Sequence, residues 1–186
     1  QFNLNYCGMV VGAMSDRLTV DSVKTTETAS EGSQSNAAQD WIDTLLADNR
    51  FDALQIDVRE AALRDGETFV GVNLRDGDVP MLTHELTYDG DVGVLAVMDD
   101  YGTNMLAAVK IWWVGDRKRA NIYFPDSVEK YWMGEAGDLS PFSEPVTVKS
   151  VEGKGAGIPL VRFSRKRMPQ SELNDVLPLQ QPEAYI

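Results

Sequence analysis

The stretch NRFDALQIDVREAALRDGETFVGVNL, from Asn49 to Leu74, decides the fold. Apolar residues recur at helical spacing through its first half, with charged residues mostly on the other side. Gly66 then supplies the left-handed residue that commonly ends a helix. A run of β-branched and apolar residues follows at once, from Thr68 to Leu74. The stretch therefore predicts an amphipathic helix that leads directly into a β-sheet.

Two further helices are expected before this stretch. Apolar residues at helical spacing predict the first, over about residues 4–18, and Ser35 or Asn36 is placed to cap the second. The second helix has an apolar face that includes Trp41, which we assign to the core. Between the helices, Leu18 to Val23 alternates as a short strand would, and Lys24 to Ser35 is polar and typical of a loop.

Short extended runs follow Leu74 without helical spacers, which argues for antiparallel pairing. Trp112 and Trp113 are neighbours on one of these strands and should point to opposite faces. The predicted strands are 80–86, 92–98, a return strand that includes 109–113, 120–124, 128–133 and 158–165, with turns at 75–77, 99–104 and 116–119, a loop at 134–145 and a short helix from about Gln170. The fold class is α+β: N-terminal helices pack on an antiparallel β meander, and a final strand and helix return across it.

Length and charge limit the function classes. The 186 residues suffice for one sizeable domain, and no apolar run is long enough to span a membrane. Cys7 is the single cysteine, so no internal disulfide forms. The 29 acidic and 17 basic residues give a net charge of −12, and such a chain as a whole repels nucleic acid.

No catalytic, cofactor-binding or metal-binding residue is predicted. His84 is the single histidine, and no Ser or Cys has a recognisable nucleophile context. GKGAG at 153–157 lacks the Lys–Ser/Thr pair of a phosphate loop and leads into a strand. The acidic residues Asp89, Asp91, Asp99 and Asp100 do not have calcium-loop spacing and suit turns better. An enzyme that uses this cluster with a divalent metal is the less favoured alternative.

Two basic clusters are the candidate contact residues: Arg117, Lys118 and Arg119, and Arg165, Lys166 and Arg167. The simplest interpretation is solvated charge in hairpin turns. The functional interpretation is an electrostatic contact with DNA phosphates or with an acidic patch on a neighbouring subunit.

Several motifs in order resemble the portal proteins of tailed bacteriophages with double-stranded DNA. Portal chains of this type have a helix that ends in a Gly-x-Thr-Phe-Val-like strand, as at Gly66–Val70 here. They also have an Ile-Pro-Leu-Val-x-Phe strand and a later Ser-Glu-Leu-x-Asp-Val helix start, matched by Ile158–Phe163 and Ser171–Val176. The match covers most of residues 1–180 in the family's order.

The resemblance implies a structural role without enzymatic activity. Residues 1–66 would be the helical part of a portal wing domain, 67–165 its antiparallel sheet, and 166–186 the start of a C-terminal helical segment. Stem, clip and crown have no counterpart, and Pro178 and Pro182 interrupt the last helical pattern, so a wing fragment is expected.

The same resemblance names the expected partners. Portal proteins form a cyclic homo-oligomer, usually of twelve subunits, at one capsid vertex of the virion, after assembly in the bacterial cytoplasm. The ring docks the terminase, capsid and tail-adaptor proteins, and double-stranded DNA passes through it without sequence-specific binding. Another phage head–tail adaptor or structural domain is the main alternative, and no membrane association is expected.

Overall fold

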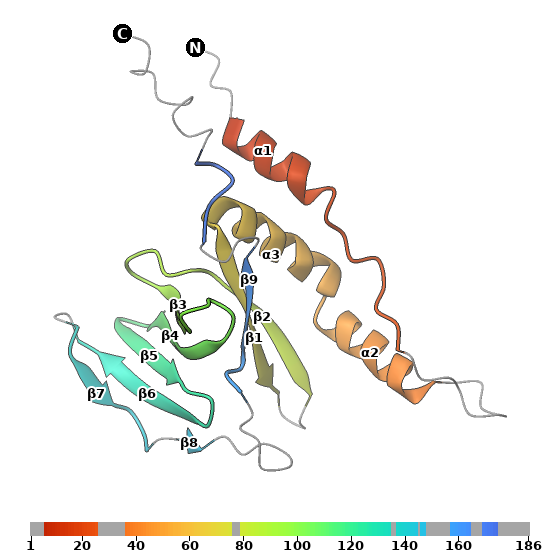
Figure 1. The fold of residues 1–186 in the computed structure, drawn as a ribbon. Coiled ribbons are helices and arrows are strands. Elements are labelled where there is room, and N and C mark those ends of the chain that lie inside the picture. The colour runs from red at the N-terminus through yellow and green to blue at the C-terminus, as the bar shows by residue number, and fades with distance from the viewer. Residues whose placement is uncertain are drawn as a thin grey trace, which may run out of the picture.

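The computed structural model describes residues 6–25, 36–75, 79–134, 137–144, 146–147, 157–164 and 169–174. The fold is α+β, with helices packed on one antiparallel sheet and a second antiparallel sheet beside it (Figure 1). The elements are α1 (Tyr6–Ser15), α2 (Ala37–Asp48), α3 (Phe51–Asp65), β1 (Glu67–Leu74), β2 (Pro80–Glu85), β3 (Gly93–Met98), β4 (Met105–Val114), β5 (Arg117–Tyr123), β6 (Ser127–Met133), β7 (Leu139–Pro141), β8 (Val146–Thr147) and β9 (Leu160–Ser164). In the part of the chain that is described, no helix has the length and apolar character needed to cross a membrane.

The predicted helix ends are confirmed. Asn36 caps α2, since its side-chain oxygen accepts hydrogen bonds from the backbone N–H groups of Ala38 and Gln39 at 3.2 and 3.3 Å. Gly66 ends α3 with φ of +89°, and its N–H donates to the carbonyl of Ala62. The chain enters β1 at the next residue, as the sequence predicts.

The predicted antiparallel strands are present, but they divide into two sheets. The first sheet has the order β2-β1-β9, and the second has the order β3-β4-β5-β6-β7, with β8 also paired to β6. The return of the final strand is confirmed: β9 pairs with β1, with Glu67 opposite Ser164 and Gly71 opposite Leu160. The first hairpin and the last strand therefore form one sheet, although the whole second sheet lies between them in the sequence.

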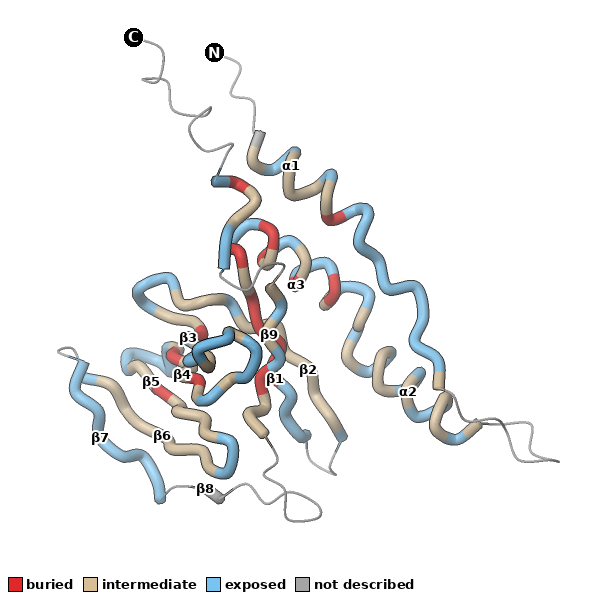
Figure 2. Tube along the Cα trace, viewed as in Figure 1, coloured by how far each residue is buried: buried red, intermediate tan, exposed pale blue. Residues whose placement is uncertain are grey.

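The core lies on both faces of β1. Phe69 is completely buried and packs with Val94, Ala108 and Leu160 where the two sheets meet. Side chains alternate along a strand, so Thr68 and Val70 point the other way, towards the side on which α3 contacts the sheet. Figure 2 shows buried residues concentrated along β1, α3 and the junction of the sheets.

The strand predicted from Leu18 to Val23 is wrong. This segment runs without regular structure beside α2 and α3, and side chains hold its backbone instead of a partner strand. The N–H of Val20 donates to Gln55 Oε1 at 3.0 Å, and Arg59 donates to the carbonyl of Leu18. Alternating apolar residues form a strand only where another strand is free to pair with them.

Two expectations for the C-terminal third also change. The predicted loop at 134–145 contains the short strand β7, which pairs with the end of β6. The helix expected from about Gln170 is a turn at Glu172–Asn174 as far as it is described, and its remainder lies outside the described residues. This turn meets the end of α3, because the N–H of Glu172 donates to the carbonyl of Leu63 at 2.9 Å.

Truncation of Phe69 tests the core. Phe69→Ala should lower the free energy of unfolding by about 3–5 kcal/mol, because the ring is fully buried between the sheets. Leu74→Ala is the matched control on the same strand: Leu74 is 65% exposed, and its truncation should change stability by less than about 0.5 kcal/mol. Urea denaturation measures both. Equal effects would show that this junction is not the core.

Two glycine substitutions test the contact between α3 and the C-terminal turn. A Cβ at Gly66 would lie 2.6 Å from the backbone N of Gln170, whereas a Cβ at Gly90 would meet nothing within 4 Å, and both residues have positive φ. Gly90→Ala should therefore cost about 1–2 kcal/mol through the backbone alone. Gly66→Ala should cost clearly more in the same denaturation experiment, and equal costs would contradict this contact.

Candidate functional site

The first basic cluster lies on a strand and not in a turn as predicted. Val114 pairs with Arg117, so the β4–β5 turn has only two residues, Gly115 and Asp116. Gly115 has φ of +64°, which suits the first central position of such a hairpin turn. The strand geometry then sends alternate residues of the cluster to opposite faces of the second sheet.

Arg117 and Arg119 share one face of the second sheet with three aromatic rings. Arg119 is paired with Trp112 on β4 and with Trp132 on β6, so the three side chains form a row across the sheet. The Arg119 guanidinium lies 4.2 Å from the ring centre of Phe142 and 5.4 Å from those of Trp112 and Trp132. The Arg117 guanidinium lies 4.4 Å from the ring centre of Trp132. We call this group, Arg117, Arg119, Trp112, Trp132 and Phe142, the basic–aromatic face.

Stacking leaves these arginines able to bind an anion. A guanidinium that lies flat on an aromatic ring keeps its N–H groups at its edge, in the geometry that matches a carboxylate or phosphate. Arg119 Nε is buried and has no hydrogen-bond partner among the described residues. The face therefore combines cation–π contacts of about 0.5–2 kcal/mol each with Arg117, which is exposed and forms none of the ion pairs found among the described side chains.

Lys118 lies on the opposite face and is already paired. Its amino group forms an ion pair with Asp91, and Trp113 Nε1 donates to the same carboxylate at 2.9 Å. These two hydrogen bonds, from Lys118 first and then Trp113, lower the pKa of Asp91. Trp112 and Trp113 do point to opposite faces, as predicted, and Trp113 is 50% exposed.

The acidic cluster does not form a metal site. Asp89 Oδ1 accepts hydrogen bonds from the backbone N–H groups of Asp91 and Val92, which closes a turn. Asp99 caps the β3–β4 turn, and hydrogen bonds led by the backbone N–H of Thr103 lower its pKa to about 2. Within the described ranges, no three acidic, histidine or cysteine side chains converge as metal ligands.

His84 belongs to the first sheet and binds a core residue. Its Nε2 lies 2.9 Å from Oγ1 of the fully buried Thr68, and that hydroxyl also donates to the carbonyl of Glu85. Burial lowers the pKa of His84, against the charges of Asp57 and Glu85, which raise it. His84 is therefore a partly buried polar residue of the first sheet.

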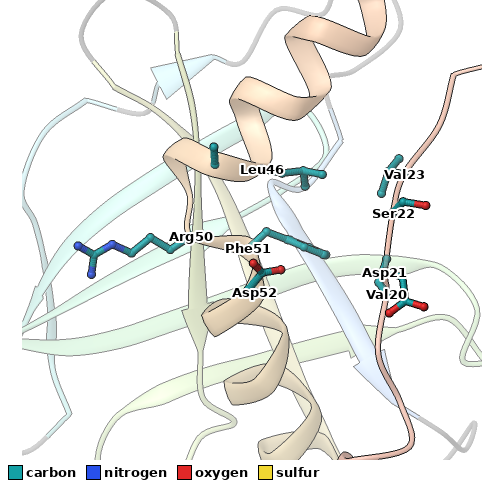
Figure 3. A pocket seen from close by; sticks show the side chains of 9 residues that line it. Val20, Asp21, Ser22, Val23, Leu46, Arg50, Phe51 and Asp52 are labelled. Atoms are coloured by element: carbon teal, nitrogen blue, oxygen red, sulfur yellow. The ribbon is translucent and has the colours of Figure 1, made fainter.

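A cavity of about 290 Å³ lies between the segment Val20–Val23 and the junction of α2 and α3. In Figure 3, the apolar side chains of Leu46, Phe51 and Val23 face this space, and the Arg50 side chain extends away from them. The residues that line it include carboxylates and one serine but no histidine, cysteine or lysine.

Three further expectations concern individual residues. The second basic cluster, Arg165, Lys166 and Arg167, lies outside the described residues. The assignment of Trp41 to the core is wrong: Trp41 is 57% exposed on α2, and no residue of α2 is buried. Sequence reasoning missed Phe142, which lies in the predicted loop and reaches the basic–aromatic face only because β7 pairs with β6.

Comparison with known proteins identifies no relative. No protein family matches this chain, and no curated protein matches it.

The buried histidine predicts a pH dependence of stability. The unfolded chain takes up the proton near pH 6.5, and the folded chain takes it up only at lower pH, so the free energy of unfolding should fall as the pH decreases below about 6.5. His84→Gln keeps a hydrogen-bonding partner for Thr68 but does not titrate. Urea denaturation between pH 5 and 7.5 should show a shallower slope for the variant, and identical slopes would contradict the assignment.

Proposed function

We propose that this chain is the wing-domain part of a phage portal protein. In this proposal it is a structural subunit of a cyclic homo-oligomer, usually of twelve copies, at one vertex of the capsid. DNA enters and leaves the capsid through the ring, and the ring docks the terminase, the capsid and the tail adaptor. The chain itself catalyses no reaction and needs no cofactor.

The observation that carries this proposal is that the two sequence stretches resembling portal proteins meet in space. The helix–glycine–strand stretch forms α3 and β1, and the Ile158–Phe163 stretch forms β9, which pairs along β1. Ser171, which begins the third motif, donates to the carbonyl of Arg64 at the end of α3. Segments about 90 residues apart in the sequence therefore make one structural unit, and this supports the proposal that the motifs belong to one fold of the portal type.

The charge distribution is compatible with DNA passing nearby. The helical part from residue 36 to residue 65 exposes seven carboxylates: Asp40, Asp43, Asp48, Asp52, Asp57, Glu60 and Asp65. Together with the net charge of −12, this acidity opposes tight binding of phosphates, which would slow a moving duplex. The basic–aromatic face is too small to neutralise a duplex, so we assign it to contact with another subunit. The second basic cluster, Arg165–Arg167, stays a candidate for the same kind of contact.

Two alternatives predict different observations. A head–tail adaptor would share the fold class and the acidity, but it would bind the tail side of a portal ring and not the terminase. A divalent-metal enzyme requires convergent carboxylates, and the hydrogen bonds of Asp89 and Asp99 within their own turns speak against it. Such an enzyme would gain thermal stability from Mg²⁺, Mn²⁺ or Ca²⁺ by mass action.

Electron microscopy of the protein at the full length of its gene tests the proposal. We expect rings with a central hole, and we expect these rings to bind the terminase large subunit from the same genome in co-sedimentation. Rings that bind a tail protein and not the terminase would favour the adaptor. A protein that forms no ring and is stabilised by a divalent metal would overturn the structural role.

A further inference from the structure

We propose that α2 of one copy docks on the basic–aromatic face of a second copy of this chain. The inference rests on the proposed ring and names the two surfaces that meet in it. One surface is the exposed side of α2 with Trp41, Asp40 and Asp48, and the other is the row of arginines and rings on β4, β5 and β6.

Helix α2 is poorly covered by its own chain. None of its residues is buried (Figure 2). Trp41 is 57% exposed. The helix touches α3, and Gln39 joins it to the segment before it through the N–H of Thr25 and the carbonyl of Val23. Tryptophan is one of the side chains enriched at the energetic centres of protein interfaces.

The charge of α2 has one sign. The helix contains Asp40, Asp43 and Asp48 and no lysine or arginine. Asp43 accepts a hydrogen bond from Gln39, whereas Asp40 and Asp48 take part in none of the ion pairs found among the described side chains. Asp48 lies in the last turn, where a negative charge opposes the helix dipole, so it weakens α2 locally. These carboxylates are therefore available to a cation from outside.

The basic–aromatic face supplies what α2 lacks. Its two guanidinium groups lie close to aromatic rings and form none of the ion pairs found among the described side chains, and Arg117 is exposed. Trp132 and Phe142 pack edge to face at 5.5 Å, and a further tryptophan is the natural neighbour for such a pair. A net charge of −12 disfavours nucleic acid as the occupant and favours an acidic protein surface.

The two surfaces cannot meet within one copy. Strands β5, β6 and β7 lie at the end of the molecule remote from α2, with the first sheet between them (Figure 1). Contacts between two different patches of identical chains are heterologous, and they build closed rings or open filaments instead of a two-fold dimer. The arrangement therefore fits head-to-tail assembly.

A charge swap tests this contact in the full chain. Asp40→Lys with Asp48→Lys should raise the dissociation constant for self-association at least about tenfold in sedimentation velocity at low salt. Arg117→Glu with Arg119→Glu should do the same. Mixing the two variants should restore association, since each then presents the complementary surface to the other. Raising the salt concentration should weaken the wild-type contact.

Matched controls separate docking from folding and from general charge. Trp41→Ala should weaken association, whereas Trp113→Ala, which removes another half-exposed tryptophan, should not. Asp100→Lys reverses one negative charge in an exposed turn away from both surfaces and should have no effect, whereas either Asp40→Lys or Asp48→Lys alone should weaken association. Circular dichroism melting checks that each variant is folded. If the arginine reversal unfolds the chain, the α2 variants still decide the question, because they change only exposed residues.

The outcomes distinguish this contact from the proposed function. A chain that stays monomeric at millimolar concentration and low salt, or that associates equally in every variant, overturns the docking. If the variant with Arg117→Glu and Arg119→Glu loses DNA binding but still self-associates, the docking is also overturned. The basic–aromatic face would then be a nucleic-acid contact. If the protein forms rings that bind terminase and the charge reversals do not change its association, the docking contact fails and the portal proposal stands. If mixing the two charge-reversed variants restores association but the protein forms no rings, the docking contact stands and the portal proposal fails.

Discussion

Burial of β1 on both faces is the constraint on which the rest of the structure depends. Thr68, Phe69 and Val70 are all buried, and they point in alternate directions, to the side of α3 and to the second sheet. Both edges of the strand are also occupied, by β2 and β9. Gly71 shows how closely its neighbours approach, since a Cβ there would lie 2.7 Å from Thr83 Oγ1. This one strand thus connects α3, the two outer strands of the first sheet and the second sheet in a single unit.

Two partly buried ion pairs fix the orientation of the elements around this strand. Glu67 pairs with Arg162 across β1 and β9, and Glu85 pairs with Lys110 across the two sheets. Pairs of this kind add little net stability, but the loss of one partner leaves an uncompensated charge at a cost of about 3–5 kcal/mol. The Lys110 amino group also lies 5.4 Å from the ring centre of Trp112. The basic–aromatic face is therefore held in a defined position relative to the first sheet.

Local patterns predicted the elements well and their long-range arrangement only in part. The Asn36 cap, the Gly66 end of α3 and the two-sided placement of Trp112 and Trp113 all depend on neighbouring residues, and all are confirmed. The division into two sheets depends on which strands pair with β9 and β3, and no local sequence pattern contains that information. The prediction that Trp41 lies in the core was wrong for a related reason. Helical spacing identifies the apolar side of the helix, but it does not show whether the chain supplies a partner for that side. The basic cluster was predicted in a turn, but the turn is Gly115 and Asp116 and the cluster begins the next strand. Because only a strand places alternate residues on one face, the shared face of Arg117 and Arg119 was not predicted.

The marginal stability of α2 links its folding to whatever covers it. An isolated helix of 12 residues is barely stable in water. To its Asn36 cap, α2 adds a limited contact with α3, the hydrogen bonds of Gln39 and, at its C-cap, those of Asn49 with Pro80 and Leu82. A partner that buries Trp41 and neutralises Asp48 would remove an exposed aromatic surface and an unfavourable charge at the same time. Binding and helix formation would then reinforce each other, because a partner that binds only the folded helix also stabilises it.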